Sequence, residues 1–438
     1  MPISKPPCST KISAPPSNPH PAMVLNKSKK QVIALYGATF LGAVLNFVAS
    51  KLNTDVLDPI AYGDVRYVLN IIQLLSWLVL FGWFMSGSRL LALSHDAQRS
   101  ARIRGVLVLF LCAATALLVV LTAAAGIIHT GNAQVRTLFF CSLPVCLYPL
   151  LTNYMNTTAQ GDNHIYRLAL ARVLPVATFI VLALIVYPRW GATPRSVLWL
   201  HWGTCSAVLV LLIASTRPSF RQLHPIAIEL QHENRDYGIQ LYWGSLAMVA
   251  TNYLSGVTLG LWSDNNALVG YYTLALSLAQ PISYLPGIVG TTFFKRFAGE
   301  QCIPRRVLLF TGVLTAVSLL GFVLLIRPVV SLYDDSYRIV APYAALLAVG
   351  FSIHGMGDMI NRYLGSHGQG RSIRNSSFLC GAVKIVGSLL FVWLWKVEGA
   401  ILTVILSSTV YAVSLFCNYR NFVRKNQYLC SRKTQQEA

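Results

Sequence analysis

Twelve long apolar stretches, separated by short polar segments, occupy most of the chain. Each is close to the roughly 17 to 25 residues that a helix needs to cross about 30 Å of hydrocarbon. The stretches are residues 32–52, 66–84, 103–128, 135–158, 166–187, 197–214, 238–262, 267–294, 307–326, 339–363, 376–395 and 400–418. The pattern predicts an all-α membrane protein with twelve transmembrane helices.

The second six stretches repeat the first six at an offset of about 207 residues. The matched pairs are Tyr36 with Tyr237, Gly63 with Gly270, Arg89 with Arg296, Tyr154 with Tyr363, and Gly191 with Gly399. Because six is even, both halves must enter the membrane from the same side, as in the parallel class of transporter repeats. We therefore expect two six-helix lobes, residues 31–214 and 238–420, joined by a linker at 215–237.

Composition agrees with a membrane protein, since 55% of the 438 residues are hydrophobic and 11% are charged, against about 25% charged in a soluble domain. Most of the 35 Lys and Arg residues lie near one set of span ends. The positive-inside rule then places both termini in the cytoplasm. We expect the protein to lie in the cytoplasmic (inner) membrane. The net charge of +20 reflects this bias, so it gives no support to nucleic-acid binding.

The two ends of the chain are polar. Residues 1–30 are rich in proline and lysine and are expected to form a disordered cytoplasmic tail, and residues 421–438 form a second cytoplasmic tail. Met23 precedes a short basic lead-in to the first span and is a candidate translation start.

The sequence contains no motif typical of a catalytic site. The nine cysteines are scattered, and no Ser-His-Asp set, phosphate-binding loop or metal-ligand spacing occurs. The predicted outer connections are too short to house an active site. We expect a transporter rather than an enzyme, with neither a cofactor nor a metal.

Charges inside the predicted spans carry the functional signal. Lys384 is roughly 12 Å and Arg172 roughly 9 Å from the inner end of its span, at 1.5 Å per residue. A charge at such depth costs at least about 2.5 to 3.5 kcal/mol, so it usually faces a cavity or a partner. Lys384 is expected in a cavity, whereas Arg172 either lines that cavity or extends to the inner headgroups.

Other charges have two interpretations. Arg89 and Arg296 line the cleft or anchor helices at the headgroups, and Arg66 lines the exit side or faces solvent. The predicted cleft residues are Arg172, Lys384, Arg66, Arg89 and Arg296.

The tenth predicted span carries a row of three titratable groups at helical spacing: His354, Asp358 and Arg362. Of the 15 Asp and Glu residues, only Asp358 lies well inside a span. Asp358 and Arg362 are one turn apart, so they form a buried ion pair or take part in proton coupling.

Several segments carry a family resemblance. Residues 269–275 (Val-Gly-Tyr-Tyr-Thr-Leu-Ala), Leu285-Pro286 and residues 295–298 (Lys-Arg-Phe-Ala) are similar to the "GxYxxA … P … RxxA" stretch of polysaccharide flippases of the Wzx type. Residues 57–63, 341–343, 362–370 and 397–400 resemble the same family, and the likeness runs from about residue 30 to 420.

The resemblance implies the multidrug/oligosaccharidyl-lipid/polysaccharide (MOP) exporter fold, with two lobes around a central cleft. It also implies a flippase that moves polyprenyl-diphosphate-linked oligosaccharides from the inner to the outer leaflet by alternating access, for O-antigen, capsule or exopolysaccharide synthesis. The implied partners are this glycan, membrane lipids, a polysaccharide polymerase and a chain-length regulator. A cationic cleft would select the diphosphate.

Two other functions stay open. A cation-coupled multidrug exporter of the same fold needs carboxylates within the membrane, and Asp358 would be one. A membrane polysaccharide polymerase or acyltransferase usually has a large outer loop or a polar catalytic cluster, and it has no obvious use for the repeat.

Overall fold

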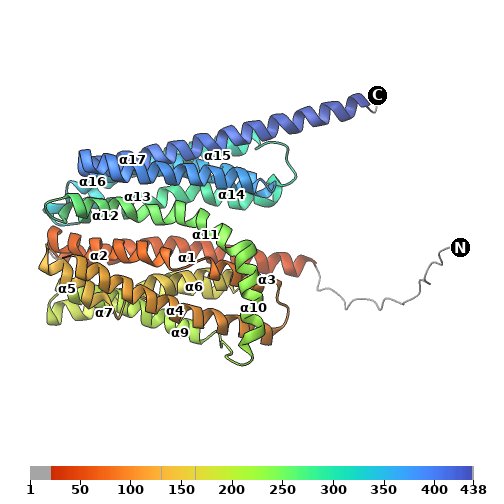
Figure 1. Ribbon diagram of the computed structural model, residues 1–438. Coiled ribbons are helices and arrows are strands. Elements are labelled where there is room, and N and C mark those ends of the chain that lie inside the picture. The colour runs from red at the N-terminus through yellow and green to blue at the C-terminus, as the bar shows by residue number, and fades with distance from the viewer. Residues whose placement is uncertain (1–20, 130, 163, 437–438) are drawn as a thin grey trace.

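The computed structural model describes residues 21–129, 131–162 and 164–436, which form helices and connecting turns without a strand among them. Figure 1 shows two bundles of roughly parallel helices lying against each other. The described chain begins and ends at the same end of the molecule, which we call the terminal face, and the other end is the opposite face. The predicted all-α fold class is confirmed.

The first bundle contains ten helical segments. They are α1 (Pro21–Val56), α2 (Pro59–Leu78), α3 (Trp83–Leu93), α4 (Ala97–Ile128), α5 (Ala133–Ser142), α6 (Tyr148–Gly161), α7 (Ile165–Trp190), α8 (Pro194–Leu198), the π-helical η1 (Trp199–Gly203) and α9 (Thr204–Ala214).

The second bundle follows a linker made of α10 (Leu223–Glu233) and η2 (Asn234–Gly238). It comprises α11 (Ile239–Ser245), η3 (Leu246–Ala250), α12 (Thr251–Trp262), α13 (Ala267–Ala279), η4 (Gln280–Ser283), α14 (Tyr284–Phe297), α15 (Arg305–Val330), η5 (Asp335–Tyr337), α16 (Val340–Ser366) and α17 (Gly370–Gln436).

The expected tail needs one correction. Residues 1–20 lie outside the described part of the chain, but α1 begins at Pro21, so residues 21–30 are helical rather than disordered. Proline suits the first turn of a helix, because the missing N–H would have no partner there. Beyond Pro21 the segment contains neither proline nor glycine before the first span.

Local sequence explains the breaks between helices. Asp58 caps α2, where its side chain accepts hydrogen bonds from the backbone N–H groups of Ile60 and Ala61. Gly82 has φ of 80°, a conformation that favours glycine, and α2 and α3 are bent there by 58°. α17 spans two predicted stretches, with non-helical backbone at Trp395 and Lys396 between them.

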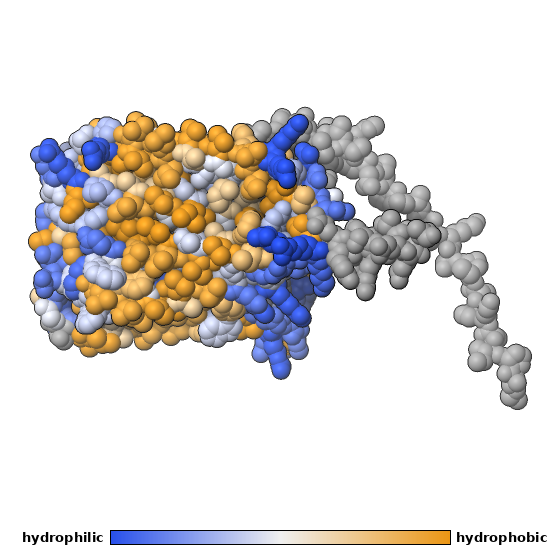
Figure 2. Space-filling view, turned by 90° about the horizontal axis from the view of Figure 1, so that it is seen from above, coloured by the Kyte–Doolittle hydropathy of each residue, from blue (hydrophilic) through white to orange (hydrophobic). Residues whose placement is uncertain are grey.

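Every predicted apolar stretch is mostly helical, although turns at 79–82 and 143–147 interrupt two of them. The molecule carries an apolar belt between two hydrophilic ends (Figure 2). By length and composition alone, six described helices are suited to cross a membrane, or seven if the bent pair α2–α3 counts as one span. The protein is therefore a multi-pass membrane protein, while the count of twelve spans stays a prediction.

The linker contains a helix, α10, that packs on the first bundle. α10 packs on α3 and α4, with Ile226 and Leu230 buried. Glu233 pairs with Arg89 at 2.5 Å, and Glu229 pairs with Arg99. These contacts hold the linker on the first bundle at the terminal face.

The two bundles touch closely at the opposite face. A Cβ on Gly63 of α2 would overlap the carbonyl oxygen of Asn266, and a Cβ on Gly270 of α13 would lie 3.2 Å from the backbone nitrogen of Gly63. Asn266 Nδ2 also donates to Asp64 Oδ1 at 2.7 Å within this buried contact. The repeat-matched glycines therefore face each other and allow the two backbones to approach.

Candidate functional site

A cavity of about 500 Å³ lies between the two bundles. The first bundle contributes side chains from α1, α2, α6 and η1, and the second contributes side chains from α12, α13, α14, α16 and α17. Gly63 and Gly270 meet about one helical turn beyond the cavity-lining residues Arg66 and Thr273. Their contact therefore lies between the cavity and the opposite face.

The charges that line the cavity come from both bundles. Arg66 belongs to α2, Asp358 to α16 and Lys384 to α17, and two histidines, His201 and His354, also line the cavity. Two basic side chains against one acidic side chain give the lining an excess of basic groups. This balance favours an anionic group in the cavity.

Lys384 lies where the sequence predicts it, in the cavity. The residue is 9% exposed, and its Nζ donates to Asn252 Oδ1 at 2.5 Å. Because Asn252 belongs to α12, this contact joins two helices of the second bundle at the cavity wall. A point charge at this depth strengthens any interaction with an anion, since the surroundings are less polar than water.

Arg66 enters the same cavity from the first bundle. Its guanidinium lies over the ring of Tyr62, 5.6 Å from the centroid. Its Nε is buried and has no hydrogen-bond partner in the described part of the chain. Leaving such a donor unsatisfied costs about 1 to 3 kcal/mol, so an acceptor that enters the cavity would be stabilised by it.

Asp358 is held by a neighbouring helix rather than by Arg362. The hydroxyl of Tyr411 donates to Asp358 Oδ1 at 3.1 Å, and the ring of His354 stacks on Tyr411 with centroids 4.7 Å apart. Of the two interpretations, the ion pair between Asp358 and Arg362 does not form in this structure, where Arg362 is exposed and packs beside Gly290 of α14. Keeping the guanidinium in solvent avoids the cost of burying it.

The other three predicted cleft cations lie outside the cavity lining. Arg172 of α7 donates to Thr39 Oγ1 of α1. Arg89 pairs with Glu233 and lies 4.7 Å from the ring centroid of Tyr237. Arg296 pairs with Glu300 at 3.3 Å, and its side chain is 62% exposed. Of the predicted set, the structure brings together Arg66 and Lys384.

Sequence reasoning missed most of the uncharged polar lining. The amide side chains are Asn46, Asn70, Gln73, Asn252 and Gln280. Asn70 and Gln73 are three residues apart in an otherwise apolar segment, which was a usable signal for one polar helix face. His201 stacks on Phe179 with centroids 4.2 Å apart and also lines the cavity.

Comparison with known proteins assigns the family. Residues 28–294 match the sequence model of a family described as polysaccharide biosynthesis protein. The chain belongs to this family. No curated protein matches the sequence of this family member.

Solved structures similar to this polysaccharide biosynthesis protein are membrane transporters. The lipid II flippase MurJ, in an inward closed conformation, has a TM-score of 0.69 and 12% identity over 89% of this chain and 87% of that chain. An inward-facing multidrug resistance MATE family transporter of the MOP superfamily has a TM-score of 0.66 and 14% identity over 91% of this chain and 99% of that chain. A MOP superfamily transporter from Pyrococcus furiosus, described as having a binding pocket of reversed polarity, has a TM-score of 0.58 and 13% identity over 90% of this chain and 96% of that chain.

These likenesses establish the fold of this family member as that of MOP superfamily transporters.

Proposed function

We propose that this polysaccharide biosynthesis protein is a flippase for polyprenyl-diphosphate-linked oligosaccharides. The observation that carries the proposal is the pair of cations, Arg66 and Lys384, which line one cavity from different bundles. A diphosphate carries several negative charges and many acceptor oxygens, so it matches this lining better than a neutral or cationic solute does. Residues 31–214 and 238–420 act as the two lobes that enclose it.

The rest of the cavity suits sugars. Asn70, Gln73 and Gln280 offer amide donors and acceptors for hydroxyl groups, while Tyr148 and Trp202 offer flat apolar faces for sugar rings. Pockets that combine apolar walls with a few placed polar groups are typical of small-molecule sites. The polyprenyl tail stays in the bilayer while the sugars cross between the lobes.

The orientation follows from charge. The terminal face carries the basic span ends, so it is assigned to the cytoplasm, and the opposite face is the outer side of the inner membrane. In the present conformation the contact between Gly63 and Gly270 closes the outer side. The substrate then enters from the inner leaflet and leaves when this contact opens. An interior-negative potential favours outward movement of the diphosphate by about 2 kcal/mol per charge per 100 mV.

On the outer side, the oligosaccharide becomes the substrate of a polysaccharide polymerase with its chain-length regulator. The product is a surface glycan of the O-antigen, capsule or exopolysaccharide kind.

One observation favours a second candidate, a cation-coupled multidrug exporter. Asp358 lines the same cavity and is hydrogen-bonded to Tyr411. Such an exporter would need this carboxylate and would tolerate loss of Arg66 or Lys384. The proposed flippase would need these two cations and would tolerate loss of the carboxylate.

The test is a flipping assay in proteoliposomes loaded with a polyprenyl-diphosphate oligosaccharide, in which a lectin reads the sugar on the outer leaflet. Lys384→Glu and Arg66→Glu are each expected to lower the rate at least about tenfold, the loss from one charge-assisted hydrogen bond of about 1.5 to 3 kcal/mol. Arg296→Glu is the matched control, because this arginine lies outside the cavity lining.

Wild-type flipping by both cavity variants would overturn the proposal. Drug efflux that is lost in Asp358→Asn and kept in both charge reversals would support the exporter instead.

A further inference from the structure

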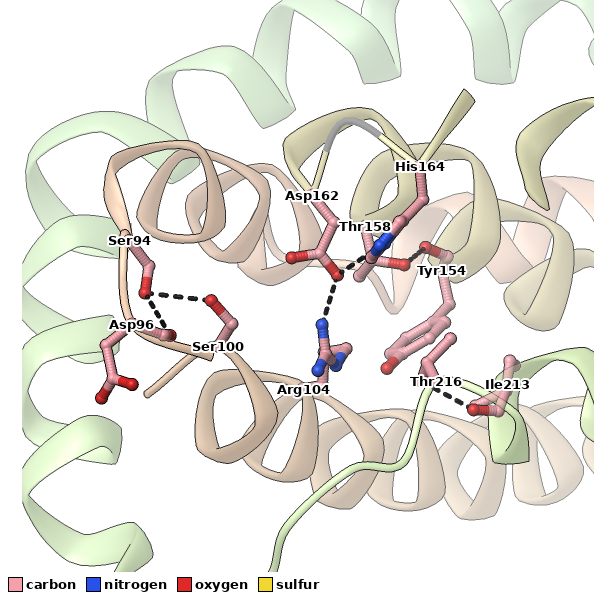
Figure 3. Close-up of polar contacts among 10 residues, drawn as sticks. All are labelled: Ser94, Asp96, Ser100, Arg104, Tyr154, Thr158, Asp162, His164, Ile213 and Thr216. Atoms are coloured by element: carbon pink, nitrogen blue, oxygen red, sulfur yellow. Dashed lines mark hydrogen bonds and ion pairs between the residues drawn. The ribbon is translucent and has the colours of Figure 1, made fainter. Parts of the chain in front are cut away.

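A second pocket, of about 770 Å³, lies at the terminal face within the first bundle, apart from the central cavity. Three connections surround it: residues 94–96 before α4, residues 161, 162 and 164 between α6 and α7, and residues 215–217 after α9. None of these residues lines the interlobe cavity. Figure 3 shows the polar groups at its base.

Arg104 of α4 is the buried cation of this pocket. It is 9% exposed, and its Nη1 donates to Asp162 Oδ2 at 2.6 Å. His164 Nδ1 lies 3.6 Å from the same carboxylate oxygen. Figure 3 shows the guanidinium next to the Asp162 carboxylate, with the ring of Tyr154 on its other flank in this view. Arg104 Nε is buried without a hydrogen-bond partner among the described residues.

The pocket has an excess of cations. Arg167, Arg217 and His95 join Arg104 in its lining, while Asp96 and Asp162 are the acids. The Asp96 carboxylate already accepts hydrogen bonds from the backbone N–H groups of Gln98 and Arg99 as the cap of α4. Three arginines and two carboxylates therefore leave one net positive charge in the pocket when its histidines are neutral. Such a site favours a phosphate, which arginine binds through paired N–H groups.

The second bundle shows what fills the corresponding place there. Tyr363, the repeat partner of Tyr154, donates to the carbonyl oxygens of Glu300 at 3.2 Å and Gln301 at 2.7 Å. These carbonyls belong to the turn between α14 and α15, residues 298–304, which is longer than the turn at 94–96 in the first bundle. The Tyr154 hydroxyl is buried and has no partner within the described ranges. The longer turn covers its tyrosine, and the shorter turn leaves a pocket.

We propose that this pocket binds the phosphate headgroup of an anionic phospholipid of the leaflet at the terminal face. The adjoining helices offer an apolar path for acyl chains, since Leu170 of α7 is 49% exposed and Leu211 of α9 is 70% exposed. Both leucines lie one to two turns deeper than the pocket. A soluble phosphate would gain nothing from these side chains, so the lipid is favoured over the free anion.

The test measures lipid and phosphate binding to the full-length protein in detergent. Native mass spectrometry detects the bound molecule, and thermal unfolding measures the stabilisation that it gives. The probes are phosphatidylglycerol, phosphatidylcholine and inorganic phosphate, each added at the same phosphate concentration. Wild type is expected to retain phosphatidylglycerol preferentially and to unfold at a higher temperature with it. Arg167→Gln combined with Arg217→Gln should weaken this binding about tenfold or more, since each arginine near an anionic headgroup contributes about fivefold.

The matched control is Arg305→Gln combined with Arg306→Gln, which removes the same charge from the terminal face of the second bundle. This variant should bind phosphatidylglycerol as wild type does. Arg167 and Arg217 are not fully buried, so their replacement should leave the fold intact, unlike that of Arg104.

Three results would overturn the proposal: equal retention of phosphatidylglycerol and phosphatidylcholine, equal loss in the control variant, or the same stabilisation by inorganic phosphate. The readout is independent of flipping, so its failure leaves the proposed transport function standing.

Discussion

The two ends of the interface between the bundles use repeat-matched residues in opposite ways. At the opposite face, Gly63 and Gly270 face each other, and no Cβ fits between the backbones. At the terminal face, Arg89 and Arg296 turn to separate acids, Glu233 of the linker and Glu300 of the following turn.

Matched glycines can pack against each other across an approximate two-fold axis, whereas matched arginines repel and each finds its own carboxylate. The matched glycines are therefore in close contact at the opposite face, whereas the matched arginines at the terminal face each bind a different acid. An alternating-access cycle requires such a difference between the two faces in each state.

The largest effect is expected from Gly63→Leu. A Cβ at this position would overlap the carbonyl oxygen of Asn266, so the opposite face cannot close without a backbone shift. Overpacking of this kind costs about 1 to 3 kcal/mol. We expect flipping in proteoliposomes to be nearly abolished while the protein still inserts into membranes.

The matched control for this substitution is Gly321→Leu in α15, where a Cβ would meet nothing within 4 Å. Flipping at the wild-type rate by Gly63→Leu would show that this contact is not needed for transport.

Asn266→Ala should have the next largest effect. It removes the donor to Asp64, which is 2% exposed, and a buried acceptor without a partner costs about 1 to 3 kcal/mol. The expected result is a lower unfolding temperature in detergent and slower flipping. Gln134→Ala, an exposed amide at the same face, is the control. Unchanged stability in Asn266→Ala would mean that the hydrogen bond contributes little to closure.

Tyr337→Phe tests a weaker contact at the same face of the molecule. The Tyr337 hydroxyl donates to the carbonyl oxygen of Leu57 at 3.3 Å, and its ring meets Tyr62 edge to face. Phenylalanine keeps the ring contact and loses one hydrogen bond, worth about 1 kcal/mol. A small drop in unfolding temperature is expected, and a drop as large as that of Asn266→Ala would contradict this ranking.

The smallest effects are expected at the terminal face. Arg89→Ala and Arg296→Ala each remove one half-exposed or exposed ion pair, which contributes about 0 to 1 kcal/mol. Unfolding temperatures and flipping rates should remain near wild type. A loss comparable to that of Gly63→Leu would mean that the linker contact, rather than the opposite face, limits the cycle.

Much of the architecture could be read from the sequence. Apolar stretches of membrane-spanning length become helices because backbone polar groups in hydrocarbon must be satisfied within the segment. The internal repeat predicted two bundles, and the depth of Lys384 predicted its place in a cavity. These features depend on residue type and spacing along one helix, which the chain alone specifies.

Packing between the helices decides which side chains line the cavity. Arg66 and Lys384 line it, whereas Arg172 contacts Thr39 and Arg362 remains exposed, although all four are cations near predicted spans. The rotation of each helix and the length of a turn set these outcomes, as the turns at 94–96 and 298–304 show. Hydropathy does not encode rotation about a helix axis, because it is set by the shapes of the neighbouring helices.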